Sequence, residues 1–113
     1  MNLDELTIGQ ARELSALFGT TPPEDNSHWQ EGKNYFVRTV THHLLGRLVK
    51  VTSQELVLTD CSWIADDGRF NEFMTTGEAS EVEPFPDCAD VIVGRGSLID
   101  AVRWNHELLR DVK

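Results

Sequence analysis

The sequence has few basic residues. Its 113 residues include 10 lysines and arginines against 19 aspartates and glutamates, which leaves a net charge of −9. Binding to DNA, RNA or an anionic membrane depends on clustered positive charge, because each neutralised phosphate needs a lysine or arginine. Here the basic residues are few and scattered. The composition therefore argues against nucleic acid and membrane as partners and leaves a basic protein partner open.

Long apolar runs are absent as well. No stretch approaches the roughly 20 apolar residues that cross a bilayer. The start of the chain, Met1–Glu5, lacks the basic start and apolar stretch of a secretory signal. We therefore expect a protein of the cytoplasm, organised as one domain with a single modest core.

Cysteine is scarce. Cys61 and Cys88 lie too far apart in the sequence for a redox Cys-x-x-Cys motif or a zinc knuckle. Cys61 falls in the middle of an apolar run, where a small buried hydrophobe is expected. A cytoplasmic setting argues against a disulfide between the two, although the sequence leaves their redox state open.

Patterns of catalytic or metal-binding residues are missing too. No serine or cysteine lies in a nucleophile turn. His42 and His43 are adjacent in an expected strand, so their rings point to opposite faces and do not suit one metal ion. Asp66-Asp67-Gly68 lacks the ligand spacing of a calcium loop, and capping of a helix explains the two aspartates better. We predict no enzyme, no cofactor and no metal site.

What the sequence does contain is β-strand signal. Residues 34–42 are rich in aromatic and β-branched side chains, and residues 47–51 alternate apolar with basic ones. The connections are too short for crossovers, so the first three strands should form an antiparallel meander. The expected strands cover residues 34–42, 47–51, 56–64, 90–93 and 97–102.

Gly94-Arg95-Gly96 interrupts the last of these runs. The two glycines allow a tight bend with Arg95 at its tip. Arg95 with its glycine neighbours is the candidate ligand-binding group, for a carboxylate, a phosphate or a base. The alternative is an ion pair within the chain.

This order of elements resembles the Sm-like family of small barrels, and more generally an SH3-like barrel. The residues that carry the resemblance are Gly46, Leu48, Val51, Leu58, Asp60 and the Arg95-Gly96 pair. The resemblance implies an N-terminal helix followed by a five-stranded, strongly bent antiparallel barrel, here with a helical insertion before the last strands. It also implies a ring-forming habit.

The base-binding positions of that family depart from its pattern. Where the family has an aspartate and an asparagine in the turn between its second and third strands, this chain reads Thr52 and Glu55. A carboxylate near the path of a phosphodiester repels RNA. The resemblance therefore supports the fold more than it supports RNA binding.

The segments around the strands have their own signals. Thr7 and Gln10 fit a capping box for an amphipathic helix over residues 8–18, which Gly19 ends. Residues 20–31 read as a polar linker. The insertion at residues 65–89 predicts a helix ended by Gly77 and a short acidic edge strand over 81–86. The barrel itself spans residues 32–104, and the tail 105–113 becomes ordered only by docking on its own barrel or on another chain.

Several large apolar side chains lie outside the expected barrel core. We predict a protein interface from this group, with Trp29 and Trp104 exposed: Trp29, Phe70, Phe73, Val82, Phe85 and Trp104. The runs at residues 6–11 and 63–70 also look like small bacteriophage and prophage proteins.

These observations give three functional hypotheses. The first is a non-enzymatic homo-oligomer acting through protein contacts as a phage accessory or virion-associated protein, in the host cytoplasm or the virion, with other phage or host proteins as further partners. The second is an Sm-like ring that binds a nucleotide or short RNA. The third is an acidic inhibitor of a host nucleic-acid-binding enzyme.

Overall fold

The computed structural model describes residues 28–113. The chain divides into two compact units, residues 1–30 and 31–113. All helices and strands of the described residues belong to the second unit. The helix expected over residues 8–18, with its cap at Thr7, and most of the linker expected over residues 20–31 lie outside the described part.

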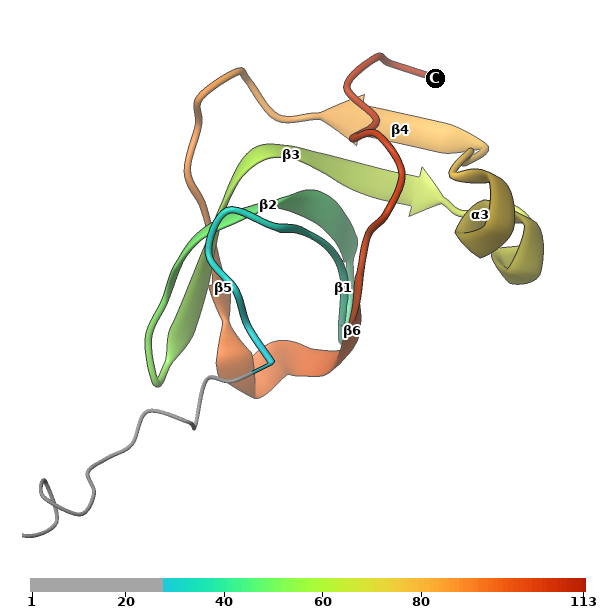
Figure 1. The fold of residues 1–113 in the computed structure, drawn as a ribbon. Coiled ribbons are helices and arrows are strands. Elements are labelled where there is room, and N and C mark those ends of the chain that lie inside the picture. Colours follow the sequence, from blue (N-terminus) through green and yellow to red (C-terminus); the bar gives the residue numbers. More distant parts are fainter. Residues whose placement is uncertain (1–27) are drawn as a thin grey trace, which may run out of the picture. The chain divides into compact units, whose positions relative to one another are not determined.

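The second unit is mostly β-structure with one α-helix and one short 3-10 helix (Figure 1). In chain order the elements are β1 (Asn34–Thr39), β2 (His43–Val51), β3 (Glu55–Asp66), α3 (Phe70–Thr76), β4 (Glu81–Pro84), β5 (Val91–Gly94), the 3-10 helix η3 (Arg95–Ser97) and β6 (Leu98–Arg103).

The strands form one antiparallel sheet. β1, β2 and β3 make the predicted meander, and β6 returns to pair with β1. The sheet order is β4-β3-β2-β1-β6, while β5 pairs with β3 off this path. The long strand β3 is shared along one edge, since its first half pairs with β5 and its second half with β4.

The prediction of a closed, five-stranded barrel is wrong. The described residues form six strands, because Glu81–Pro84 pairs with β3 as the expected acidic edge strand. The sheet also stays open, since β5 and β6 do not pair with each other in this part of the chain. β5 has only four residues, and η3 separates it from β6.

The first predicted strand is too long. Thr39 and His42 close a tight turn in which the Thr39 amide donates to the His42 carbonyl at 2.8 Å and the His42 amide donates to Thr39 Oγ1 at 2.9 Å. A threonine side chain that bonds nearby backbone in this way competes with the sheet ladder. Consequently β1 ends at Thr39, β2 begins at His43, and Gly46 lies inside β2, not before it.

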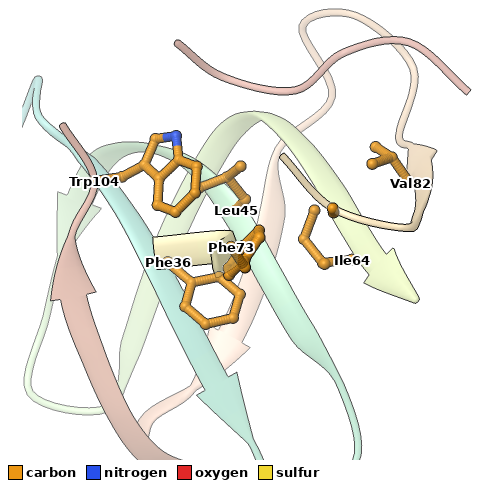
Figure 2. Packing of buried hydrophobic residues seen from close by; sticks show 7 residues of the cluster. Phe36, Leu45, Ile64, Phe73, Val82 and Trp104 are labelled. Atoms are coloured by element: carbon orange, nitrogen blue, oxygen red, sulfur yellow. The ribbon is translucent and has the colours of Figure 1, made fainter. Parts of the chain in front are cut away.

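An aromatic cluster forms the core on one face of the sheet. Phe73 of α3 lies with its ring centroid 4.8 Å from that of Phe36 and 4.9 Å from that of Trp104 (Figure 2). Trp104 is only 4% exposed, and its indole N–H donates to the Glu107 carbonyl. The expectation that Trp104 is exposed is therefore wrong. Seven buried residues make up the cluster: Phe36, Leu45, Ile64, Phe73, Ala79, Val82 and Trp104.

The insertion packs against this core through α3, but not by the predicted cap. The helix begins after Arg69, which makes no side-chain capping bond. Asp66 instead accepts the Gly68 amide, and the Asp67 carboxylate lies 3.1 Å from His43 Nδ1. Gly77 ends the helix as predicted, in a left-handed conformation with its amide bonded to the Phe73 carbonyl.

The C-terminal tail docks on its own chain, the first of the two predicted options. Figure 1 shows it returning over the sheet to run beside β4. Lys113 exchanges both backbone hydrogen bonds with Val82, and Ser62 Oγ donates to the Leu109 carbonyl at 2.6 Å. The Arg110 guanidinium donates to the carbonyls of Cys61 and Phe85 and pairs with the Asp87 carboxylate. The tail therefore covers the outer edge of β4 at Val82.

The Arg110 contacts should be a main source of tail stability. Arg110→Ala should lower the free energy of unfolding by about 2–3 kcal/mol, because buried carbonyls lose a charged donor. Arg110→Lys keeps the charge but not the planar fork, so it should recover less than half of the loss. Urea denaturation measures both. The exposed Arg69 is the control, and Arg69→Ala should change stability by less than about 0.5 kcal/mol. Equal effects of the Arg69 and Arg110 variants would contradict the assignment.

Gly77 should be far less replaceable than Gly96. A Cβ at Gly77 would lie 2.6 Å from His106 Cγ, and the residue has φ +78°. Both the clash and the left-handed backbone should make Gly77→Ala cost about 1–3 kcal/mol of unfolding free energy. A Cβ at Gly96 meets no atom within 4 Å. Gly96→Ala should therefore be neutral or slightly stabilising in thermal denaturation.

The two thiols should differ sharply in reactivity. Cys61 is fully buried, as the sequence predicts, and burial raises its pKa to about 12, while Cys88 is exposed. Iodoacetamide at pH 8 should label one thiol per native chain and two per unfolded chain, counted by mass spectrometry. The raised pKa means that the folded chain holds this proton more tightly. The raised pKa of Cys61 therefore adds to the free energy of unfolding below about pH 9, and this contribution is lost as the pH rises towards about 12.

Candidate functional site

Arg95 does not project freely into solvent from the tip of a bend. It begins η3, is half-buried, and its amide donates to the Gln54 carbonyl at 2.8 Å while its guanidinium donates to the Thr52 carbonyl. Gly94 and Gly96 beside it are exposed. The structure thus joins the β5–β6 turn to the turn at Thr52–Glu55, and Arg95 serves the backbone of that turn.

The predicted interface residues do not form one surface. Phe73, Val82 and Trp104 are buried in the core cluster and are not available to a partner. Phe70 is exposed, but the Arg38 guanidinium lies 4.9 Å from the centre of its ring. Trp29 is half-buried and belongs to the first compact unit. Of the six, Phe85 alone lines the groove described below.

The adjacent histidines do lie apart, in two different settings. His42 contacts the Trp63 ring, with 5.4 Å between ring centroids. His43 turns instead towards Phe36 and the Asp67 carboxylate. Across residues 28–113, no three His, Cys, Asp or Glu side chains gather in a way that suits a metal ion.

A groove lies beside β5, and we call it the β5 groove. It is wide open to solvent and has a volume of about 300 Å³. Leu44 and Val93 are its buried apolar residues, Phe85 is half-buried, and Ile92 is 62% exposed. Apolar walls with a few hydroxyl and ring groups are typical of binding sites. Its lining residues are Thr39, His42, Leu44, Phe85, Ile92, Val93, Gly94 and Ser97.

The outer edge of β5 carries backbone groups beside this groove. In an antiparallel pair, alternate residues turn their N–H and C=O groups away from the partner strand. The Arg95 amide bonds to the Gln54 carbonyl. By alternation, the backbone N–H and C=O groups of Val91 and Val93 point towards β3, and those of Ile92 and Gly94 point away from it. Ser97 Oγ bonds the Gly94 carbonyl at 2.8 Å. Within residues 28–113, the outward groups that stay unpaired are the N–H and C=O of Ile92 and the N–H of Gly94.

The same alternation accounts for the covered edge of β4. There the Phe85 amide bonds to the Cys61 carbonyl, so Val82 faces outward, and Lys113 bonds both of its backbone groups. The tail therefore bonds the outward backbone groups of β4, whereas the corresponding outward groups of Ile92 on β5 have no such partner within residues 28–113. This contrast marks β5 as the available half of the shared edge.

Trp63 and Glu83 complete the surface. They are direct partners across the β3–β4 pair, so their side chains lie on one face of the sheet. Trp63 also pairs with Leu44 and touches His42, both of which line the β5 groove. Trp63 is 38% exposed and Glu83 is exposed. An aromatic face and a carboxylate thus stand together at the border of the groove.

Charge on the opposite face is paired within the chain. Asp100 of β6 accepts two hydrogen bonds from the Arg38 guanidinium, at 2.7 and 2.5 Å. These bonds hold the pKa of the Asp100 carboxyl below its usual range and raise that of Arg38. Neither group is therefore poised as a proton donor or acceptor near neutral pH.

The sequence alone does not mark most of this surface as a site. His42 stands out only as half of an adjacent histidine pair, and Trp63 and Ile92 fall within expected strands. The sequence does carry one signal. Trp63 lies in a run with apolar side chains on both faces of the expected strand, so each face of that strand needs an apolar contact. What supplies each contact depends on the fold.

No known protein family matches the chain, and neither a curated protein nor a solved structure is found to be similar to it. Within residues 28–113, no helix has the length and apolar character needed to cross a membrane. The resemblances to Sm-like barrels and to phage proteins therefore stay predictions from the sequence.

Proposed function

We propose that the protein is not an enzyme and acts through protein–protein contacts made by the open edges of its sheet, first of all by association with copies of itself. The observation that carries the proposal is the outer edge of β5, where Ile92 is 62% exposed beside an apolar groove. Exposed strand edges with apolar side chains pair readily with other chains.

β6 supplies a second open edge. It pairs with β1 on one side, no described strand lies on its other side, and Ile99 is 65% exposed. Proteins often protect such edges with proline or with charged residues, lysine above all. Neither lysine nor proline occurs in β5 or β6, and the charged residues of these two strands are Asp100 and Arg103 of β6. By contrast, β4 ends at Pro84 and is covered by the tail. This difference supports a role for β5 and β6 in association.

Contact between β5 of one copy and β6 of the next would join two different surfaces. Such head-to-tail contacts close into rings or continue as filaments. The proposal extends to a bacteriophage or prophage role, as an accessory or virion-associated protein, on the resemblance of residues 6–11 and 63–70 to small phage proteins. Nucleotide or RNA binding receives no separate support, because the Arg95 guanidinium donates to the Thr52 carbonyl.

Light scattering over a range of protein concentrations tests the proposal. The unaltered chain should form a defined oligomer, and Ile92→Lys and Ile99→Lys should each reduce association at least tenfold, because a charge then replaces an apolar contact at an edge. The matched control is Val49→Lys. Val49 is 39% exposed on β2, which has neighbours on both sides, so this variant should associate normally.

Two results would contradict the proposal. One is a chain that stays monomeric at every concentration. The other is an oligomer that survives both isoleucine changes, which would show that the open edges do not make the contact.

A further inference from the structure

We infer that Trp63, Glu83 and the β5 groove together bind an extended, basic segment of a partner protein, with a lysine or arginine on Trp63 and Glu83 and an apolar side chain two residues away in the groove. The inference rests on the proposed function, and it adds the chemistry of the partner and a second use of the β5 edge.

The first element is a cation site. Trp63 and Glu83 are direct cross-strand partners, and the Phe85–Cys61 bond fixes the alternation so that they form a hydrogen-bonded pair. The Cα atoms of such pairs lie about 5.5 Å apart with both side chains on one face. A guanidinium or ammonium over the indole is attracted by the ring, and the carboxylate at its side adds a charge-assisted bond.

The second element is the support given to Trp63. The ring of His42 lies against the indole at an interplanar angle of 57°. Thr41 Oγ1 lies 2.7 Å from Nδ1 of that histidine, which holds the imidazole at the turn between β1 and β2. Trp63 is therefore positioned between the carboxylate of Glu83 and a residue that lines the groove.

The third element is the place for the backbone and the apolar side chain. The outward N–H and C=O of Ile92 and the N–H of Gly94 suit an added strand. Leu44, Phe85 and Val93 then offer apolar contact at the groove. Because successive side chains of a strand point to opposite sides, alternate residues of the bound segment would meet this face.

Charge complementarity selects a basic partner. None of the eight groove residues is a lysine or arginine. Exposed carboxylates flank the surface: Glu83 lies beside Trp63, and Asp90 precedes β5. The whole chain carries a net charge of −9, which favours approach of a basic segment and disfavours an acidic one.

Two capped peptides and the full chain test the inference. The probes are acetyl-Arg-Thr-Val-Thr-Arg-amide, whose arginines and valine share one face of a strand, and its charge-reversed form, acetyl-Glu-Thr-Val-Thr-Glu-amide. Each is titrated into the ¹⁵N-labelled full chain carrying Ile99→Lys, a change at an exposed position of β6 that should keep β6 of another copy off the β5 edge. The signals of the Trp63 indole, the Ile92 amide and the Gly94 amide are followed. The arginine peptide should shift all three signals in a saturable way and bind at least tenfold more tightly than the glutamate peptide.

Charge reversal supplies the matched variants. Glu83→Lys should remove the preference for the arginine peptide. Glu81→Lys makes the same change two residues earlier in β4, where the register partner is Asp66 and not an aromatic residue. That variant should keep most of the preference. Both substitutions are at exposed positions, so the amide spectrum should show an unchanged fold.

The outcomes separate this inference from the proposed function. Equal binding of both peptides, or equal loss of preference in the Glu81 and Glu83 variants, would overturn the assignment of a basic partner. Absence of shifts at the three signals would overturn the groove as a peptide site. Neither result bears on self-association, which light scattering with the Ile92 and Ile99 variants decides on its own.

Discussion

The division of β3 into two halves is the constraint on which the rest of the structure depends. Its residues 55–58 pair with β5 and residues 62–66 pair with β4. Between them, Asp60 adopts φ +50°, a conformation that asparagine and aspartate tolerate better than most residues, and its carboxylate pairs with Arg47 at 2.9 Å. At this break the Cys61 carbonyl accepts both the Phe85 amide and the Arg110 guanidinium.

The two halves of this edge of β3 differ in what covers their outer strands. The half that pairs with β4 is covered by the C-terminal tail. Arg110 of the tail donates to the Phe85 carbonyl, and Lys113 forms two backbone hydrogen bonds with Val82. The half held by β5 keeps its outward backbone groups and lies next to an apolar groove. One edge of a single strand therefore supplies both an internally closed surface and an open one. The open half is where we propose that partners bind.

The core takes up most of the large apolar residues of the helix and the tail. Phe36, Leu45 and Ile64 project from the face of the sheet opposite to Trp63, and other parts of the chain must pack on them to bury them. α3 supplies Phe73, and the residues after β6 supply Trp104, with Leu108 and Leu109 packed against the cluster. Burial of aromatic side chains is among the largest stabilising terms in a small domain. The residues Phe73, Val82, Trp104, Leu108 and Leu109 of the insertion and of the chain after β6 are therefore used within the chain.

Several features could be predicted from local sequence. The meander of three strands followed from β-branched composition and short connections. The end of α3 at Gly77 followed from the conformational freedom of glycine, and the edge strand at residues 81–84 from its acidic residues and prolines. The burial of Cys61 followed from its place in an apolar run. Each depends on physical chemistry that acts over a few neighbouring residues.

Other features were decided only by the tertiary structure. Local sequence does not reveal that Trp104 meets Phe73, that Arg110 reaches Cys61, or that Trp63 stands beside Glu83, because these pairs join segments that only the fold brings together. The open barrel has the same origin, since closure depends on where β5 and β6 end relative to each other. The chain alone thus determined a small acidic β-protein, and long-range packing decided which apolar residues became core and which remained for a partner.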